Sequence, residues 1–181
     1  MFGRVTFLTL CAVLPGMVEL LEVSREVLEQ LPRGAFLTVR GRNGGVNTMT
    51  IGWGTVGTVW RRPTFVVLVR PDRYTHSLME GAEDFTVSVP LKGQLKKELQ
   101  LCGTTSGKVI DKFKEHGLEE AGPKVVSSPG IAGCDVHIEC RIMYKQSMSD
   151  GKVLDPLVEE WYEDEGRHTI YFGEIVSCWS D

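Results

Sequence analysis

The amino-acid sequence predicts a mainly β fold, an antiparallel barrel with a few inserted helices. Three observations favour this class: many short runs of β-branched and aromatic residues, turn residues close behind them, and only a few segments with helical spacing of apolar residues. The 181 residues are close to the usual size of one domain, and 42% of them are hydrophobic, which suffices for one large core. We find no internal repeat, low-complexity segment or linker. One domain over residues 17–181 is therefore expected, preceded by an extension of uncertain role over residues 1–16.

The first elements follow from turn chemistry and residue type. Residues 17–23 are apolar and favour a β conformation, and Ser24 is expected to cap a short helix behind them. Residues 35–41 and 46–53 form two strands, because the RNGG between them is a hairpin turn signal. A loop is expected from there to Pro63.

The middle of the chain alternates strands with helical segments. The dense β run 64–70 ends at a proline, one or two helical turns follow at 74–81, and 84–89 is a further strand. Residues 93–103 and 107–117 each place apolar side chains at helical spacing, which predicts two helices.

The C-terminal part contains two strands, at 134–146 and 168–179, after an irregular segment at 121–133. The first of them alternates between an apolar face and a polar face that carries His137. The apolar face holds Cys134, Val136, Ile138, Cys140, Ile142 and Tyr144. His137 therefore points away from Cys134 and Cys140, which argues against the zinc site that their spacing would allow, and no metal is expected.

Charge and cysteine content limit the partners and the compartment. The formal net charge of −4 and the pI of about 5.6 do not support a basic face for nucleic acid. Five scattered cysteines make no disulfide framework and fit a reducing cytosol. The apolar run at 4–16 has the outline of a signal peptide, but it lacks a small-x-small cleavage pattern and is too short to span a bilayer. We therefore expect a cytoplasmic protein without membrane or nucleic-acid partners.

Two familiar catalytic signals are incomplete. GTTSGKV at 103–109 resembles the end of a phosphate-binding loop, but it is one residue short, and Val109 stands where Ser or Thr would bind magnesium. No set of Ser, His and Asp has the motif context of a hydrolase.

The segment NTMTIGWGT, residues 47–55, is unusually polar for a core strand. Threonine hydroxyls and the Asn47 amide offer hydrogen bonds, Gly52 and Gly54 permit close approach to the backbone, and Trp53 offers an apolar plane. Such a surface suits a flat heterocycle with a polar edge.

Two further clusters suit a phosphate group. The first combines arginines and hydroxyls in a turn before a helix, namely Arg70, Arg73, Tyr74, Thr75 and Ser77; the second is Ser106, Gly107 and Lys108. Each cluster alone also fits an ordinary structural role, because capped helices are common and exposed arginines mostly lie in solvent. Together with residues 47–55 they indicate a flat ring that carries a phosphate.

Taken in order, these segments resemble the flavin reductase-like family, which includes the flavoredoxins. The resemblance rests on NTMTIGWGTVG, RRPTFVVLVRPDRYTHSLME, DFTVSVP, CGTTSGKVIDKF and HTIYFGEI, and it covers roughly residues 18–176. It implies an FMN-binding split barrel, a closed antiparallel Greek-key barrel with helical insertions. It also implies a homodimer, with FMN at the barrel mouth near the dimer interface.

The resemblance assigns flavin contacts by matching motif. The isoalloxazine, the ribityl chain and the rim around them would involve Asn47, Thr48, Met49, Thr50, Gly52 and Trp53, and the phosphate would lie among Arg70, Arg73, Tyr74 and Thr75. Ser106 and Lys112 are expected as further FMN contacts. His168 aligns with a histidine near the nicotinamide or flavin face, and the alternative is an exposed residue of an edge strand.

The expected function is that of an FMN-binding oxidoreductase, because FMN itself carries the electrons or hydride. In this interpretation NAD(P)H reduces free flavin or another small acceptor through the bound FMN. The alternative is a flavoredoxin-type carrier that shuttles electrons between protein partners, and a weaker one is a split barrel that holds another planar ligand. The acidic run at 159–165 is either a solvated loop or a docking surface for such a partner.

Overall fold

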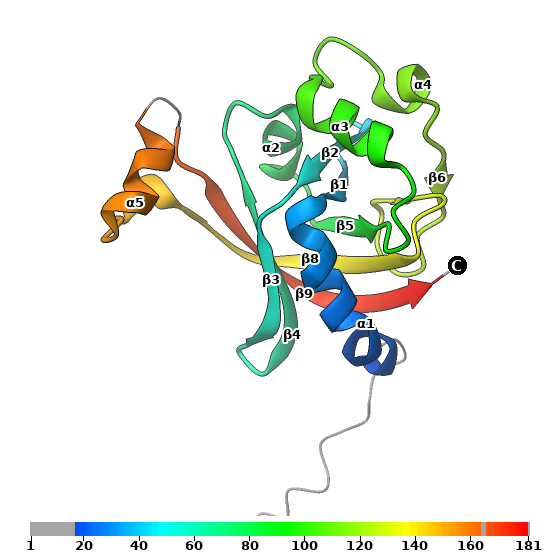
Figure 1. Cartoon of the computed structure of the whole chain (residues 1–181), viewed down its shortest axis with the longest axis horizontal. Coiled ribbons are helices and arrows are strands. Elements are labelled where there is room, and N and C mark those ends of the chain that lie inside the picture. The colour runs from blue at the N-terminus through cyan, green and yellow to red at the C-terminus, as the bar shows by residue number, and fades with distance from the viewer. Residues whose placement is uncertain (1–16, 164–165, 181) are drawn as a thin grey trace, which may run out of the picture.

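The structure, a computed structural model, describes residues 17–163 and 166–180. The predicted extension over residues 1–16 lies outside the described residues. A curved sheet with helices packed around it forms the body, and one long hairpin projects from it (Figure 1). The predicted mainly β, antiparallel class is confirmed.

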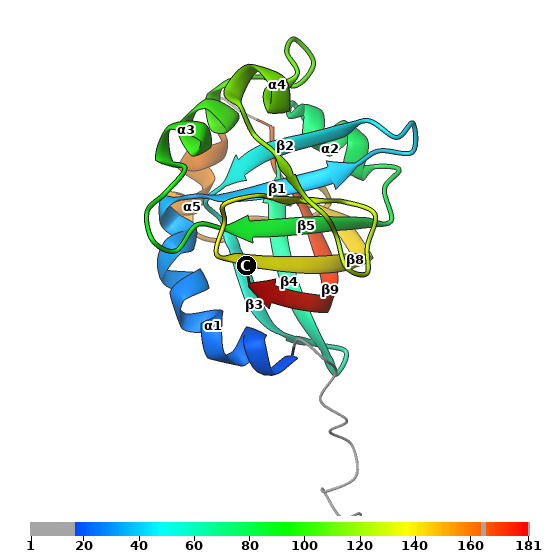
Figure 2. The same ribbon diagram turned by 90° about the vertical axis from the view of Figure 1, so that its right-hand side faces the viewer.

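Seven antiparallel strands form one ladder in the order β2-β1-β5-β8-β9-β4-β3. Their bounds are β1 Ala35–Arg40, β2 Val46–Ile51, β3 Gly54–Val59, β4 Arg62–Val69, β5 Asp84–Val89, β8 Val136–Ser147 and β9 Thr169–Ser180. Figure 2 shows the sheet curling, and β2 contacts β4 across the interior. Although β2 and β3 are consecutive in the chain, they are not neighbours in the described ladder. The barrel is therefore split between these two strands.

Hairpins at the two ends of the ladder form in different ways. The predicted β1–β2 hairpin is confirmed, and Gly44 in its turn has a positive φ of 82°. The expected loop before Pro63 is wrong, because β3 pairs with β4 along its whole length. Its turn holds Trp60 and Arg61 at φ values of 49° and 61°, a conformation that glycine or asparagine normally adopts. Since neither residue type stands there, no turn signal marks this hairpin in the sequence.

The N-terminal helix is longer than predicted. Helix α1 Met17–Gln30 is continuous, so the β conformation expected at 17–23 and the helix cap expected at Ser24 are wrong. Val27 and Leu31, four residues apart, are buried in the barrel core. Burial of this helical stripe outweighs the β preference of the residues before it.

Apart from η1, which follows α1 directly, the other helices lie in segments that connect strands. Their bounds are η1 Leu31–Arg33, α2 Tyr74–Met79, α3 Lys96–Thr104, α4 Lys112–His116, η2 Met148–Asp150, α5 Pro156–Glu159 and η3 Glu160–Tyr162. The predicted helices at 74–81 and 93–103 are confirmed as α2 and α3. The helix predicted at 107–117 is too long: α4 begins after Asp111, whose side chain accepts hydrogen bonds from two backbone N–H groups, and Val109 lies 83% exposed in a loop.

The long strands β8 and β9 pair side by side and carry a projecting segment between them. This segment, called the arm here, comprises the described residues 148–163 and 166–168 with η2, α5 and η3 (Figure 1). The predicted alternation in β8 is confirmed for Ile138 and Cys140 in the barrel core and Glu139 on the opposite face. That face is not solvated, however, because the Glu139 carboxylate accepts backbone N–H bonds from residues 124–126.

Segment 120–131 thus covers the outside of the sheet, and it contains two short paired strands, β6 Glu120–Ala121 and β7 Gly130–Ile131, where only irregular structure was predicted. A second apolar cluster lies on this outer side. Its buried members are Phe36, Leu99, Cys102, Leu118, Ile131 and Cys134. This cluster fixes α3 against β1 and β2 and so places the C-terminal end of α3 at the rim of the barrel.

Within residues 17–163 and 166–180, no helix has the length and apolarity needed to cross a membrane.

Candidate functional site

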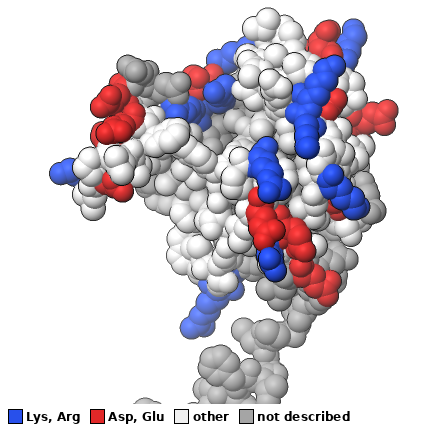
Figure 3. Space-filling view, in the orientation of Figure 1, with Lys and Arg blue, Asp and Glu red and all other residues white. Residues whose placement is uncertain are grey.

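Two joined hollows lie where β2, the start of α2 and the end of α3 meet the base of the arm. The inner hollow has a volume of about 130 Å³ and the outer hollow about 190 Å³, and both are lined by Met49, Arg73 and Gly103. The molecular surface is recessed between the arm and α3 (Figure 3). The inner hollow is also lined by Asn47, Tyr74, Thr75, Ser106 and Lys112, and the outer hollow by Thr50, Gly52, Trp53, Arg70 and His168.

Asn47 joins β2 to α2 at the floor of the inner hollow. Its Nδ2 donates a hydrogen bond of 2.8 Å to Oγ1 of Thr75, and both side chains are buried. Gly107 lies so close that a methyl group there would overlap the Asn47 side-chain oxygen and stand 2.8 Å from Cδ1 of Tyr74. The loop after α3 is therefore packed onto β2 and α2, which brings Ser106 to the inner hollow.

We expect Gly107→Ala to lower the free energy of unfolding by about 1 kcal/mol, because the added methyl displaces either Asn47 or the loop. Gly122→Ala is the matched control: a methyl at that exposed glycine meets no atom within 4 Å and should change stability by less than about 0.5 kcal/mol. Urea unfolding of both variants checks the prediction. Equal stability of the two would show that the loop does not rest on Asn47.

Lys112 is a buried cation that connects β2 to α3. Its Nζ donates to the carbonyl oxygens of Thr48 at 3.0 Å and Cys102 at 2.8 Å, and the residue is only 4% exposed. Burial lowers the pKa of Lys112, and the positive charge of Arg73 lowers it further. Two of its three donors are thus committed to the fold, and one is left at the wall of the inner hollow.

The threonines of β2 have different environments. Thr50 lines the outer hollow, and its hydroxyl donates to the carbonyl oxygen of Leu99 at 2.5 Å. Thr48 does not line either hollow: its side chain is fully buried, accepts from the hydroxyl of Thr38 and lies 3.4 Å from the Leu37 carbonyl. The Thr48 side chain therefore lines neither hollow, and its backbone oxygen, through Lys112, belongs to the wall; the flavin contact expected of this residue stays a prediction.

Arg73 is the cation that the two hollows share. One guanidinium N–H donates to the Gly103 carbonyl at 3.4 Å, and Nε lies 3.7 Å from the carboxylate of Asp72. The side chain is 42% exposed, so its charge is accessible to a ligand in either hollow. Ser77, expected in the same cluster, is turned away and donates to the backbone oxygen of Tyr74.

Aromatic side chains form the far wall of the outer hollow. The ring of Trp53 lies 5.2 Å from that of His168 and 5.6 Å from that of Trp161 on the arm. His168 is 7% exposed, so the alternative of an exposed edge-strand residue is wrong. Trp53 remains 42% exposed at the rim, where it offers a plane to a ligand.

Tyr162 on the arm contacts the same histidine. Its Oη lies 3.0 Å from Nδ1 of His168, and the guanidinium of Arg70 lies over its ring at 5.8 Å. Burial lowers the pKa of His168 to about 4, and the positive charges of Arg70 and Arg73 add to this effect while Asp72 opposes it. His168 is therefore a neutral imidazole at pH 7.

Because His168 is neutral in the folded protein, acidification is expected to lower the free energy of unfolding. The unfolded chain binds the proton near pH 6.5 and the folded chain only near pH 4, so the contribution of neutral His168 is complete above pH 6.5 and is lost as the pH falls through 4. Between these values the free energy of unfolding should fall more steeply with acid in the wild type than in His168→Gln, by at most about 1.4 kcal/mol per pH unit. Urea unfolding at several pH values measures this difference. Parallel curves would contradict it, since His76, whose pKa is also lowered by burial, is present in both proteins.

The hollows bring together all the predicted site residues except Thr48. The expected phosphate cluster is divided between the hollows: Arg70 lines only the outer one, Tyr74 and Thr75 line only the inner one, and Arg73 lines both. Sequence reasoning missed Gly103 and Tyr162. Tyr162 lies in the acidic run interpreted as a loop or docking surface, and no local pattern links it to His168.

Comparisons with known proteins relate this chain to one family. The sequence pattern described as "Flavin reductase like domain" matches residues 28–181. An uncharacterised protein of Archaeoglobus fulgidus is 29% identical over 130 residues, which cover 72% of this chain and 63% of that protein.

Solved structures show the same fold at lower identity. Flavoredoxin of Desulfovibrio vulgaris (Miyazaki F) superposes with a TM-score of 0.65 at 21% identity, covering 82% of this chain and 69% of that one. An FMN-binding domain of a flavin reductases-like enzyme from Shewanella baltica gives a TM-score of 0.63 at 19% identity, covering 86% of this chain and 73% of that one. The predicted split-barrel fold is thereby confirmed.

Proposed function

The chain belongs to the flavin reductase-like domain family, and from this premise we propose that it binds FMN in the two hollows and acts as a flavoprotein oxidoreductase. In this proposal NAD(P)H is the electron donor, and free flavin or another small molecule is the acceptor. The observation that carries the proposal is the continuity of a cation- and hydroxyl-lined hollow with one that is walled by aromatic rings.

The side chains present fit such a molecule. Arg73 and Lys112 supply positive charge at the inner hollow, and Thr75 and Ser106 add hydroxyls, which together suit a phosphate dianion. Trp53 and Met49 offer apolar surface at the outer hollow, which suits a flat ring. Pockets for ligands of this size usually measure about 300–1,000 Å³, and the two hollows joined are of that order.

When bound, FMN would supply the hydride and electron chemistry. The protein would bind and orient the FMN and shield its ring from water. Arg73 would compensate phosphate charge, and Gly52, which has no side chain, allows a ring to approach the backbone. Trp53 and His168 would exclude water from one side of the ring.

A larger groove adjoins the site and supports an anionic co-substrate. It has a volume of about 750 Å³ and shares Thr50 and Gly103 with the outer hollow. Its cationic lining residues are Arg33, Lys92 and Lys96, and Asp135 pairs with Lys92 at 2.6 Å. The phosphates of NAD(P)H would find positive charge here, while its nicotinamide would reach the adjoining outer hollow.

The electron-carrier function is a second candidate, and the rim of the outer hollow favours it. Trp161 is 63% exposed on the arm and touches Trp53, so a protein partner could approach the ring there. The acidic residues around Trp161 would favour a partner with a basic surface (Figure 3).

We further propose a homodimer and a cytoplasmic location. Exposed Trp60, Leu154 and Leu157 are apolar groups that a second copy would cover. The four cysteines of the described chain are free thiols, as in a reducing compartment. Analytical ultracentrifugation tests the dimer, and a single species with the mass of one chain would contradict it.

Reduction under anaerobic conditions tests the proposed function. The purified protein, loaded with FMN, should show a flavin spectrum that bleaches rapidly when NADH or NADPH is added. A yellow protein that stays oxidised with both nucleotides, but accepts electrons from a reduced protein donor, would replace the reductase with the carrier. A colourless protein that fails to take up added FMN would exclude both.

A further inference from the structure

His168 is held at three points, two on its ring and one on its backbone. Its Nδ1 lies 3.0 Å from the Tyr162 hydroxyl, its ring packs against Trp53, and its backbone oxygen accepts from the N–H of Met148 at 2.9 Å. The ring also lines the outer hollow. Because Tyr162 occupies Nδ1, the Nε2 edge of the ring is the one left for a ligand.

The direction of the hydrogen bond follows from the acceptors that the Tyr162 hydroxyl can reach. These are Nδ1 of His168 at 3.0 Å and the thioether sulfur of Met148 at 3.7 Å. An imidazole nitrogen is a much stronger acceptor than a thioether, so the hydroxyl proton is directed to Nδ1. Burial raises the pKa of Tyr162, so the hydroxyl keeps this proton at neutral pH.

A neutral imidazole carries one proton, which must then reside on Nε2. For this atom the structure shows no hydrogen bond to any residue it describes. We propose that Tyr162 is a positioning residue that holds His168 as the Nε2–H tautomer, so that one N–H donor faces the outer hollow beside Trp53. The arm thereby supplies a donor for an oxygen or nitrogen acceptor of whatever ring or small substrate occupies that hollow.

Charges around the imidazole maintain the neutral donor. Arg70 from the end of β4 and Arg73 from the turn after it oppose protonation, and Asp72 on the same turn partly offsets them. From the arm, Tyr162 contributes no charge but occupies Nδ1. Arg70 also lies over the Tyr162 ring, which helps to fix the ring that orients the histidine.

The tautomer of His168 is inferred independently of the proposed function, and only the identity of the ligand rests on that function. A substrate class follows from the donor: acceptors with a carbonyl, nitro or ring-nitrogen group can receive the Nε2–H bond, whereas saturated hydrocarbons cannot.

Nitrogen NMR of the cofactor-free protein tests the inference. In uniformly ¹⁵N-labelled wild type at pH 7, long-range ¹H–¹⁵N spectra should show His168 with a bare Nδ1 and a protonated Nε2. In Tyr162→Phe the two nitrogens should move towards averaged shifts, and the midpoint of the His168 titration should rise by about one pH unit, a tenfold gain in proton affinity. Tyr144→Phe, which removes a hydroxyl that donates to Gln146 from a ring that contacts Trp60 and Phe172, should leave both readouts unchanged.

A proton on Nδ1 in the wild type would overturn the inference, and so would unchanged shifts and midpoint in a folded Tyr162→Phe protein. FMN is then added to the same samples. If the His168 signals are as expected but FMN does not bind, the proposed function fails and the positioning by Tyr162 stands. If FMN binds but Nδ1 carries the proton, the positioning by Tyr162 fails and the proposed FMN binding stands.

Discussion

Lys112→Met should lower the free energy of unfolding by about 3 kcal/mol, the largest effect that we expect from a single substitution at the site. Methionine matches the length of lysine but cannot donate to the carbonyl oxygens of Thr48 and Cys102, which would remain buried without their partner. Each such group costs about 1–3 kcal/mol, and relief from burying a charge returns part of this. Because these two bonds join β2 to α3, the inner hollow should also widen and bind FMN more weakly.

Urea unfolding followed by circular dichroism measures the change, and Lys108→Met is the matched control. Lys108 is exposed on the loop before α4, so its replacement should alter stability by less than about 0.5 kcal/mol. If the Lys112 and Lys108 variants are equally stable, the ammonium group does not hold the two elements together.

Arg73→Ala should weaken FMN binding by about 2 kcal/mol, a factor of roughly thirty, while the stability of the protein changes little. The guanidinium lines both hollows and is partly exposed, so its charge contributes more to a bound anion than to the fold. Arg73→Lys should recover only part of the loss, because a lysine cannot form a bidentate contact with phosphate.

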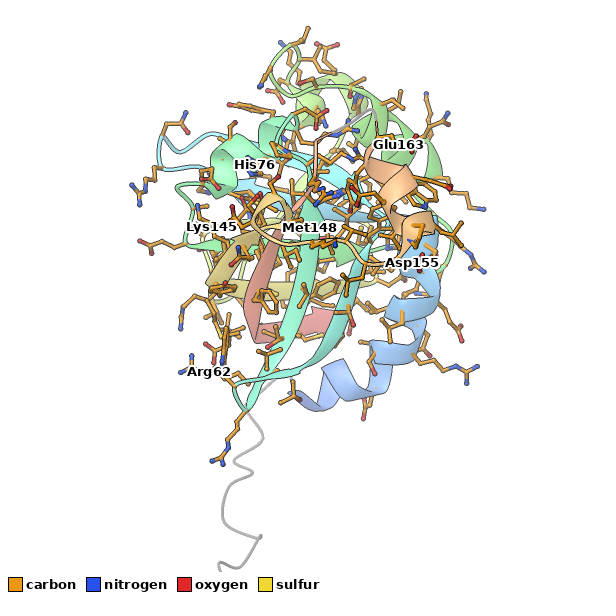
Figure 4. The ribbon with its side chains drawn as sticks, turned by 90° about the vertical axis from the view of Figure 1, so that its left-hand side faces the viewer. Arg62, His76, Lys145, Met148, Asp155 and Glu163 are labelled. Atoms are coloured by element: carbon orange, nitrogen blue, oxygen red, sulfur yellow. The ribbon has the colours of Figure 1, made fainter. Side chains whose placement is uncertain are left out.

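Fluorescence titration of FMN gives the affinities. Arg62→Ala serves as the control. Arg62 follows the β3–β4 turn, pairs with Glu174 of β9 and lines neither hollow. Figure 4 shows it at the opposite end of the molecule from His76 and Met148. It should bind FMN like the wild type. Equal losses in the Arg73 and Arg62 variants would indicate a general charge effect and not a phosphate contact.

The sequence predicted those elements whose conformation is set by turn residues or by a simple alternation of apolar and polar side chains. The β1–β2 hairpin has a glycine-rich turn, and the alternation of β8 reflects a single buried face, so both are readable in the sequence. The β3–β4 hairpin was missed because its turn uses Trp60 and Arg61 in a conformation that these residue types rarely adopt. Helix α1 was misassigned because packing of Val27 and Leu31 on the barrel decides its conformation.

The same distinction applies to the site. Asn47, Thr75 and Arg73 were found because each lies in a motif with recognisable chemistry. The Thr48 side chain does not line either hollow, because it is fully buried and accepts a hydrogen bond from Thr38 of the neighbouring strand β1, a tertiary arrangement that the motif does not show. Tyr162 was not identified as a site residue, because its contact with His168 depends on the path of the arm in space.

The central claim is that cations and hydroxyls from separate segments hold the phosphate of a flat ring whose face lies against Trp53. Comparing the dissociation constants of FMN and riboflavin for the wild-type protein tests it most directly, because the two ligands differ only in the phosphate. We predict that FMN binds at least about thirtyfold more tightly than riboflavin, with the gap narrowing at high salt. Equal affinity for the two flavins, or no binding of either, would contradict the account.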